Sequence, residues 1–389
     1  MALFPIAKIK VHSLTGRITQ PLMRAAFKAV KRNRGAAGID RVSIQMFEAN
    51  LDQNLSALER DLKNGSFQPL PLRRKYIDKG GGKLRPLGIP AVRDRVAQEV
   101  LRRLLHPIFE PLFHQASFGF RPGRNCHQAL ARGLEHHAAG YRVILDADIV
   151  GFFDNLSQAL IKEAVAAQVA DGNILNLVEK FLRAGVLEDG VFKPTTVGTP
   201  QGGVISPLLA NIVLNYLDWQ LHQLGYRFVR YADDFVVLCL SKTQAEEAKT
   251  QVTHILNQLG LTLSAEKTRI TTFGKGYSFL GFVVSSRSRR MRPKSVQKFQ
   301  DKVRELTVRS QNLDASLIVK LNRVIRGTAQ YFSPRWSTNR GLFRRLDSWT
   351  RRRLRCVKFK RFSYHHNHRM RLKHFEKLGL LSLGSFWCS

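Results

Sequence analysis

The chain has 389 residues, with 44% apolar residues and 24 Phe, which is enough material for folded cores and excludes a disordered chain. Its 63 Lys and Arg against 29 Asp and Glu give a net charge of +34, a self-repulsion that an enzyme acting on neutral substrates does not need. Length alone predicts two or three domains.

The charge predicts a polyanionic partner, either nucleic acid or an anionic membrane surface. No apolar run approaches the roughly 18–20 residues of a membrane span, and the N-terminus lacks the long apolar core of a secretory signal. We therefore expect nucleic acid as the partner, and no membrane.

The cysteines are far apart in the sequence and form no C-x-x-C pair; they are Cys126, Cys239, Cys356 and Cys388. This spacing favours neither a zinc knuckle nor a disulfide framework. We expect a reducing compartment, the cytoplasm or nucleoid of a prokaryote or an organelle.

In the first third of the chain, helical periodicity predicts helices over residues 21–65, interrupted by a loop at 34–40, and again over 94–113. Between them, residues 70–90 are typical of two strands joined through the glycines at 80–82.

Beyond residue 140 the pattern alternates between strand and helix. An apolar strand with three aspartates is predicted over 141–154, followed by a helix that Asp154 or Asn155 caps. Further helices are predicted over 208–224 and 243–259, a β-hairpin over 225–240, and strands over 261–284.

Three aspartates stand out in this basic chain: Asp148 within an apolar strand, and Asp233 and Asp234 at the predicted hairpin tip. Phosphoryl transfer uses two Mg²⁺ ions about 3.5–4 Å apart, held by carboxylates on rigid strands. An acidic pair in a turn is ordinary turn chemistry in most sequences. The combination favours a metal site, because burying three carboxylates together without a cation would be costly.

Ordered motifs run along the chain around these aspartates. Y-A-D-D at 231–234 and D-I-V-G-F-F at 148–153 resemble the Y-x-D-D box and the first palm motif of reverse transcriptases, and the order of the further motifs is similar to that of the group II intron branch. The other similar motifs are R-G-A-A-G-I-D at 34–40, K-L-R-P-L-G-I-P at 83–90, S-F-G-F-R-P-G-R at 117–124, G-T-P-Q-G-G-V-I-S-P at 198–207, E-K-T at 266–268 and F-L-G-F at 279–282.

The resemblance implies an α+β right-hand polymerase, with fingers at 1–125, a palm with a small antiparallel sheet at 126–285, and a helical thumb and maturase domain at 286–389. It implies that the catalytic residues Asp148, Asp233 and Asp234 bind two Mg²⁺ ions, with the Ile149 carbonyl as a further ligand and Mn²⁺ as a substitute metal. Asp146 lies on the same strand face as Asp148, and we expect it to be a supporting polar residue.

The resemblance also implies that Phe153 is a steric gate, whose flat ring lies under the sugar and excludes a 2′-OH, although most Phe residues are simply core residues. Nucleotide contacts are implied for Arg85 with Lys79 or Lys83, and for Gln201 and Gly202. Template and primer contacts are implied for Arg121, Arg124 and Lys267, and for a primer grip that includes Phe279, Leu280 and Gly281.

Residues 286–389 are predicted to form a mainly helical basic module, with 27 Lys and Arg against 5 Asp and Glu and a net charge of +22. Such a charge run is often only a solvated face, but aromatic residues alternate with arginines here, which suits base stacking with phosphate contact. R-G-T-A-Q-Y-F at 326–332 and residues 346–360 resemble the maturase domain of the same family. H-H-N-H at 365–368 comes without paired cysteines, so we expect it to be basic surface and an H-N-H endonuclease to be absent.

These features predict an RNA-directed DNA polymerase of the group II intron type that also has a role in splicing. The expected partners are an RNA template, above all structured intron RNA, a DNA or RNA primer and deoxynucleoside triphosphates. Two alternatives stay open: an RNA-binding maturase whose main task is splicing, and a domesticated relative that serves host defence, spacer acquisition or repair.

Overall fold

The computed structural model describes residues 3–78, 84–199 and 202–387. Its internal contacts divide the chain into two compact units, which are described separately below. Unit 1 comprises Met1–Ala129 and Leu145–Arg269, and unit 2 comprises Leu130–Ile144 and Ile270–Ser389. Helix α5 (Cys126–Ala138) and strands β3 (Val143–Ala147) and β8 (Arg269–Thr272) run across the boundaries between the units.

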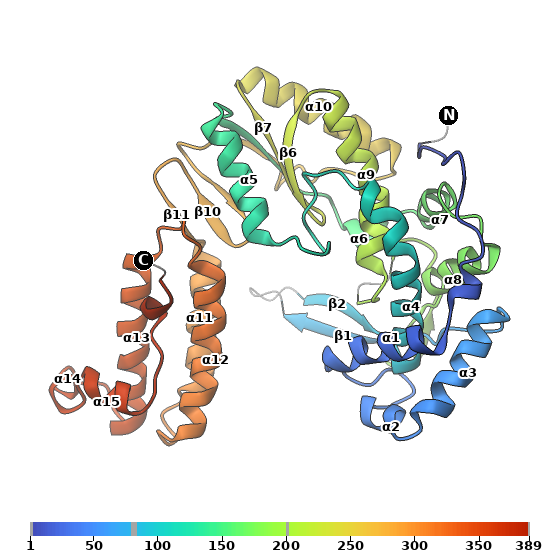
Figure 1. Cartoon of the computed structure of the whole chain (residues 1–389). Helices are drawn as coiled ribbons and strands as arrows, with labels where there is room; N and C mark the ends of the chain where they lie inside the picture. The colour runs from blue at the N-terminus through green and yellow to red at the C-terminus, as the bar shows by residue number, and fades with distance from the viewer. Residues whose placement is uncertain (1–2, 79–83, 200–201, 388–389) are drawn as a thin grey trace. The chain divides into compact units, whose positions relative to one another are not determined.

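The N-terminal part of unit 1 is a layer of helices packed on the long helix α4 (Figure 1). These helices are α1 (Gln20–Arg32), α2 (Ile44–Ala49), α3 (Leu51–Lys63) and α4 (Val92–Phe109), with the 3₁₀ turns η1 (Thr15–Arg17) and η2 (Glu110–Leu112). α1 buries Met23, Ala26, Phe27 and Val30, the i, i+3, i+4, i+7 spacing of one helix face. The helices predicted over 21–65 and 94–113 are therefore confirmed.

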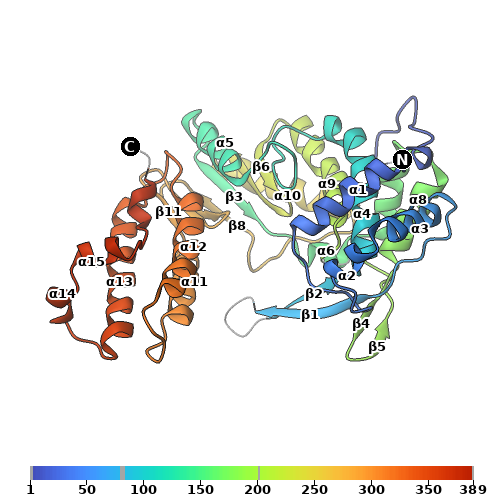
Figure 2. The same cartoon turned by 60° about the horizontal axis from the view of Figure 1, so that its bottom comes forward.

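A four-stranded sheet of order β2-β1-β4-β5 adjoins this layer (Figure 2). It is made of β1 (Leu72–Asp78), β2 (Leu84–Ile89), β4 (Val186–Glu188) and β5 (Val191–Lys193). β1 and β2 form the predicted antiparallel pair, whereas the parallel pairing of β1 with β4 joins segments more than 110 residues apart.

The palm sheet has the strand order β6-β7-β3-β8. β6 (Arg227–Tyr231) and β7 (Asp234–Cys239) form the predicted hairpin, and all five residues of β7 after Asp234 are buried. Helices α9 (Ser206–Gln223) and α10 (Lys242–Gln258) pack on this hairpin. Both helices lie where helical periodicity predicts them.

The segment after β3 differs from the prediction. β3 ends at Ala147, and Gly151, with a φ of 50°, begins the one-turn helix α6 (Phe152–Asn155). α7 (Gln158–Ala166) is capped by Ser157, whose side chain accepts a hydrogen bond from the N–H of Leu160. The predicted cap at Asp154 or Asn155 is therefore wrong, because those residues lie in a separate helical turn. α8 (Gly172–Leu182) follows, and Asp171 caps it.

Unit 2 contains a three-stranded antiparallel sheet and a group of helices. The strands are β9 (Tyr277–Phe279), β10 (Phe282–Val284) and β11 (Arg289–Met291). α11 (Pro293–Leu306), α12 (Ala315–Phe332) and α13 (Arg340–Phe359) lie side by side (Figures 1 and 2), followed by α14 (His366–Arg369), α15 (Leu372–Lys377) and η3 (Leu383–Phe386). The mainly helical character predicted for residues 286–389 is confirmed, and none of the described helices is long and apolar enough to span a membrane.

Candidate active site

The predicted catalytic aspartates lie at the ends of neighbouring strands of the palm sheet. Asp148 directly follows β3, and Asp234 is the first residue of the adjacent strand β7. Asp233 occupies the two-residue turn between β6 and β7 together with Ala232. Asp148 and Asp233 are half-buried, and Asp234 is exposed.

Lys267 forms an ion pair with Asp148 at the end of β3. Its Nζ atom lies 2.9 Å from Oδ2 of Asp148. This hydrogen bond raises the pKa of Lys267, and the negative charges of Asp148, Asp234 and Glu266 raise it further. The 2.9 Å distance places the ammonium of Lys267 in direct contact with the carboxylate of Asp148, at the end of β3.

The segment that carries Lys267 also holds the backbone of Asp148. The N–H of Ser264 donates to the carbonyl of Asp148 at 2.8 Å, and the N–H of Asp148 donates to Oγ1 of Thr268 at 3.4 Å. The E-K-T motif is therefore a support of Asp148, a role that the sequence pattern does not indicate. The side chain of Lys267 is 67% exposed, and its contact with a template or primer stays a prediction.

Asp146 pairs with a different cation. Nε of Arg269 lies 3.1 Å from Oδ2 of Asp146. Burial raises the pKa of Asp146, Arg269 opposes this rise, and the charge of Asp148 adds to it. The pairing agrees with a supporting role for Asp146.

The donor set suits a hard divalent cation, because Asp148, Asp233 and Asp234 offer only oxygen ligands. Among residues 3–78, 84–199 and 202–387, no group of three or more His, Cys, Asp or Glu side chains lies together as a finished metal site. The carboxylate of Asp148 instead pairs with the ammonium of Lys267. A positive charge at this position is thus already part of the local electrostatics, and the residues fit a metal in donor type and charge.

Phe153 lies half-buried in α6, with its ring centroid 5.0 Å from that of Phe152. It lines a cavity of about 250 Å³ that Arg74, Gly88, Lys193 and residues 194–197 also line. The N–H of Thr199 donates to the carbonyl of Phe153 at 2.8 Å. The gate residue is therefore attached to the start of the G-T-P-Q-G-G motif, although its contact with a sugar stays a prediction.

The other predicted nucleotide contacts are only partly within the described residues. Lys79, Lys83, Gln201 and the side chain of Arg85 lie outside them. Gly202 has a φ of +110°, and a Cβ atom there would lie 2.1 Å from the carbonyl oxygen of Gly88 in β2. Only glycine permits this close approach of two backbones.

Arg121 is buried, which argues against its predicted contact with the template. Its guanidinium donates to the carbonyls of His114 and Ser117 at 2.7 and 2.9 Å, and to the carboxylate of Glu110. Because these partners enclose the group, Arg121 shapes the 114–121 loop instead. Arg124 is half-buried and also donates to Ser117, and its nucleic-acid contact stays a prediction.

The predicted primer grip is a tight turn between β9 and β10. Phe279 is 4% exposed, which argues against a primer contact through its ring. Leu280 and Gly281 have φ values of 47° and 83°, as a type I′ turn requires. The carbonyl of Leu280 accepts from the hydroxyl of Tyr331 at 2.9 Å, and that of Gly281 accepts from the N–H of Arg292 at 3.0 Å. This turn therefore anchors β9–β10 to α12 and to the start of α11.

The segment of unit 2 between α13 and α14 exposes aromatic rings beside arginines. Phe362 and Tyr364 are 48% and 66% exposed, with ring centroids 5.1 Å apart. The guanidinium of Arg352 lies over the ring of Tyr364, 5.8 Å from its centroid. Exposed rings next to cations are typical of surfaces that bind single-stranded nucleic acid. His366 is buried against Phe359, so the expectation of a purely basic surface at 365–368 is wrong for this histidine.

Two family profiles match the chain. Residues 77–284 match the reverse transcriptase family (RNA-dependent DNA polymerase), which is more than half of the chain. Residues 296–375 match the maturase-specific domain of group II introns.

Curated relatives agree with this. The chain is 35% identical over 324 residues to the protein YkfC of Escherichia coli, covering 72% of this chain and 85% of that protein. It is 32% identical over 341 residues to the group II intron-encoded protein LtrA of Lactococcus lactis, covering 71% of this chain and 55% of LtrA. The chain thus spans about half the length of LtrA.

Among solved structures, a partial Cas6-RT-Cas1–Cas2 complex aligns with 63% of this chain and 40% of the chain in that complex, at 25% identity and a TM-score of 0.40. The protein belongs to the reverse transcriptase family of RNA-directed DNA polymerases, with a right-hand polymerase fold joined to a group II intron maturase domain.

Proposed function

We propose that the chain synthesises DNA on an RNA template by two-metal nucleotidyl transfer, with Asp148, Asp233 and Asp234 as the metal-binding carboxylates. The observation that carries the proposal is the placement of Asp148 directly after β3, and of Asp233 and Asp234 at the turn into the adjacent strand β7, in a chain of net charge +34. Carboxylates gathered in a strongly basic protein are suited to hold cations at the point where a polyanion must bind.

Different residues of the chain would bind the metal ions and select the nucleotide. Asp148, Asp233 and Asp234 would hold two Mg²⁺ ions, with the Ile149 carbonyl as a further ligand, and Mn²⁺ would substitute for Mg²⁺. When bound, such ions neutralise charge on the reacting phosphate and activate the attacking hydroxyl. The primer 3′-OH attacks the α-phosphate of a deoxynucleoside triphosphate, and pyrophosphate leaves. Phe153 would exclude a 2′-OH from the sugar site.

We further propose that the basic helical unit binds structured intron RNA and supports splicing. The maturase-specific domain matched at 296–375 supports this proposal, as do the exposed rings of Phe362 and Tyr364 beside Arg352. Phosphate contacts made by many Lys and Arg side chains would supply most of the affinity.

The double substitution Asp233→Asn with Asp234→Asn tests the polymerase proposal. It keeps the size and one acceptor oxygen of each side chain but removes two negative charges. Primer extension on an RNA template should be lost, while the affinity for RNA should stay within about twofold, because binding depends on cations elsewhere. DNA synthesis at the wild-type rate by this variant would exclude the proposed site.

Sequencing the RNA that co-purifies with the chain tests the intron proposal. A single structured intron RNA is expected to dominate the bound RNA. A diverse set of RNAs without intron domains would contradict the intron role and favour a domesticated function. In-vitro splicing of the bound RNA by the Asp233→Asn/Asp234→Asn variant would show that splicing does not depend on DNA synthesis.

A further inference from the structure

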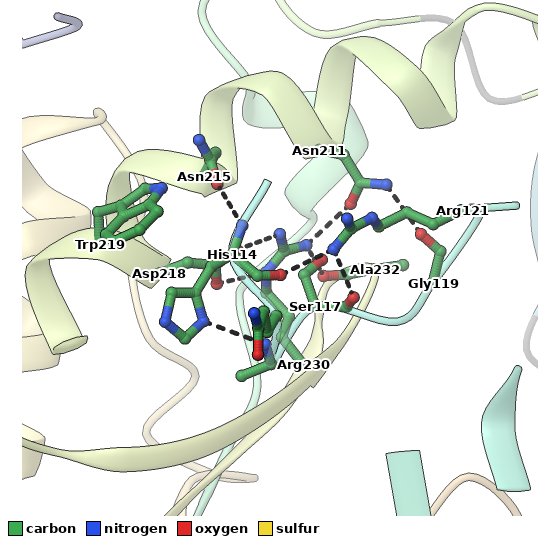
Figure 3. Close-up of polar contacts among 12 residues, drawn as sticks. His114, Ser117, Gly119, Arg121, Asn211, Asn215, Asp218, Trp219, Arg230 and Ala232 are labelled. Carbon is green, nitrogen blue, oxygen red and sulfur yellow. Dashed lines mark hydrogen bonds and ion pairs between the residues drawn. The ribbon is translucent and has the colours of Figure 1, made fainter. Parts of the chain in front are cut away.

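A fully buried arginine connects the catalytic hairpin to the helix behind it (Figure 3). Arg230, near the end of β6, and Asp218, in α9, are both 0% exposed. Nε of Arg230 lies 2.7 Å from Oδ1 of Asp218, and Nη2 lies 2.5 Å from Oδ2. This fork-to-fork pairing fixes the plane of the guanidinium, which a lysine could not do.

The remaining nitrogen of the guanidinium points to the turn that carries Asp233. Nη1 of Arg230 donates to Oδ1 of Asn211 and to the carbonyl of Ala232, both at 2.9 Å. The carbonyl of Ala232 belongs to the peptide bond whose nitrogen is that of Asp233. A hydrogen bond at this oxygen therefore restrains the backbone directly at a predicted metal ligand.

The turn also packs closely against the loop that contains Gly119. Ala232 has a φ of 58°, a strained conformation for a residue with a Cβ atom. A Cβ atom on Gly119 would lie 2.4 Å from the nitrogen of Ala232, so the loop backbone abuts the turn. Nδ2 of Asn211 donates to the carbonyl of Gly119 at 2.8 Å, which links the loop to the same guanidinium.

Stability alone does not account for such a network. Replacing a buried ion pair by apolar residues of similar volume is often neutral or stabilising, because desolvation offsets the attraction of the charges. The feature that apolar residues could not reproduce is the hydrogen bond at Ala232. The network is therefore better explained by its restraint of the Ala232–Asp233 turn than by a contribution to the free energy of folding.

We propose that Arg230, with Asp218 and Asn211, is a positioning device that holds the Ala232–Asp233 turn in the geometry needed for divalent-cation binding. This inference rests on the proposed metal site at Asp148, Asp233 and Asp234. Partners that orient metal ligands typically change metal affinity about 10–100-fold when they are removed.

The decisive variant is Arg230→Met with Asp218→Leu, which removes both charges together and leaves no buried ion unpaired. Binding of Mn²⁺ is measured by the electron paramagnetic resonance signal of the free ion, without nucleic acid or nucleotide, so that no catalysis is involved. The double variant should melt within a few degrees of the wild type and bind Mn²⁺ about tenfold more weakly. Arg230→Lys with Asp218 intact should bind with an intermediate affinity.

Two comparisons separate the possible failures. Asp233→Asn/Asp234→Asn should lose Mn²⁺ binding, and wild-type binding by that variant would mean that the proposed metal site itself is wrong. If Asp233→Asn/Asp234→Asn loses Mn²⁺ binding but a folded Arg230→Met/Asp218→Leu variant binds Mn²⁺ as the wild type does, the metal site stands and the positioning role of Arg230 is overturned. If the double variant does not fold, Arg230→Lys decides, since unchanged Mn²⁺ affinity in that variant would also overturn the proposal.

The matched control is Glu99→Gln with Arg102→Gln in α4. Glu99 is also buried and accepts two hydrogen bonds from Arg102 at 2.7 Å. Its partners lie within α4, so this variant should bind Mn²⁺ as the wild type does. A similar loss of Mn²⁺ affinity in the control would show that loss of any partly buried ion pair has the effect, and would overturn a specific role of Arg230.

Discussion

The Nζ atom of Lys267 donates a hydrogen bond to Oδ2 of Asp148 at 2.9 Å, and the charge of Asp234 also acts on this ammonium group. The ammonium group of Lys267 thus pairs with a carboxylate that is also a predicted ligand of the metal ion. The side chain of Lys267 is 67% exposed and that of Asp148 is 33% exposed, so the pair contributes at most about 1 kcal/mol.

Lys267→Met should therefore strengthen divalent-cation binding, because the ammonium no longer competes for Asp148. The limit of about 1 kcal/mol corresponds to at most about fivefold in affinity, measured by Mn²⁺ titration in the absence of nucleic acid. The same variant should have a raised KM for template–primer if Lys267 also contacts the nucleic-acid backbone. Lys249→Met, in the exposed face of α10, is the control, and weaker Mn²⁺ binding in Lys267→Met would contradict the competition.

Phe153→Val should raise the incorporation of ribonucleotides relative to deoxynucleotides. A smaller side chain leaves room for a 2′-OH, and the loss of one steric contact in a pocket changes discrimination by about tenfold or more. The measurement is single-nucleotide extension with UTP and dTTP in parallel, in which dTTP extension is the internal control. An unchanged ratio of the two rates would show that Phe153 does not select against the 2′-OH of the sugar.

Gly198→Ala should displace Phe153 through the backbone of α6. Gly198 has a φ of +83°, and a Cβ atom there would lie 2.6 Å from the carbonyl oxygens of both Phe153 and Asp154. The backbone of α6 must shift to relieve this clash. We expect a loss of deoxynucleotide selectivity in addition to a loss of stability.

Gly190→Ala is the matched control for that substitution. Gly190 has the same φ of +83°, but a Cβ atom there would meet no atom within 4 Å. It should cost only the conformational strain of about 1–2 kcal/mol and leave nucleotide selectivity unchanged. Equal selectivity in the two variants would show that α6 does not transmit the clash to Phe153.

Local patterns predict the parts of this fold that depend on neighbouring residues. α1 follows from its apolar spacing, the β6–β7 hairpin from two apolar runs around Ala232 and Asp233, and α9 from a long apolar stretch. The parallel pairing of Leu72 with Val186 is not predictable in this way, because it depends on how two distant segments are brought together by the packing of α4 and α8.

The candidate site can likewise be predicted only in part from local sequence patterns. The Y-A-D-D and D-I-V-G-F-F motifs identify the aspartates, because their chemistry requires these residue types. Motif membership does not distinguish a nucleic-acid contact from a structural group, as the buried Arg121 shows. Its burial is set by Glu110 and by the carbonyls of His114 and Ser117, and only the folded loop determines these partners.

Asp94 should make the stability of unit 1 depend on pH. Burial raises the pKa of Asp94 from 3.8 to about 6, although the N–H of Leu70 and the charge of Arg93 oppose this rise. The folded state therefore holds this proton more tightly than the unfolded state does. The free energy of unfolding falls as pH rises through this window, by at most about 3 kcal/mol at about 1.4 kcal/mol per pKa unit.

Asp94→Asn should remove this dependence, since the amide stays neutral and its oxygen can still accept from Leu70. Urea unfolding at pH 4 should give similar stabilities for the two proteins, whereas above pH 6 the variant should be the more stable. Asp52→Asn, at an exposed position of α3, should show no such trend. A stability difference that does not change between pH 4 and pH 7 would contradict the effect of burial on Asp94.

Asp347 should control the attachment of the C-terminal segment to unit 2. This buried carboxylate accepts from the N–H of Leu383 at 2.8 Å, the hydroxyl of Ser382 at 2.6 Å and the N–H of Gly384 at 3.1 Å. Asp347→Ala leaves the buried N–H of Leu383 without this acceptor, at a cost of about 1–3 kcal/mol. Amide hydrogen exchange in the η3 segment should become faster, while exchange in β6 and β7 of unit 1 stays the same. Ser348→Ala, at the exposed neighbouring position of α13, is the control, and unchanged protection of η3 in Asp347→Ala would mean that apolar packing of Leu383 holds the segment without the carboxylate.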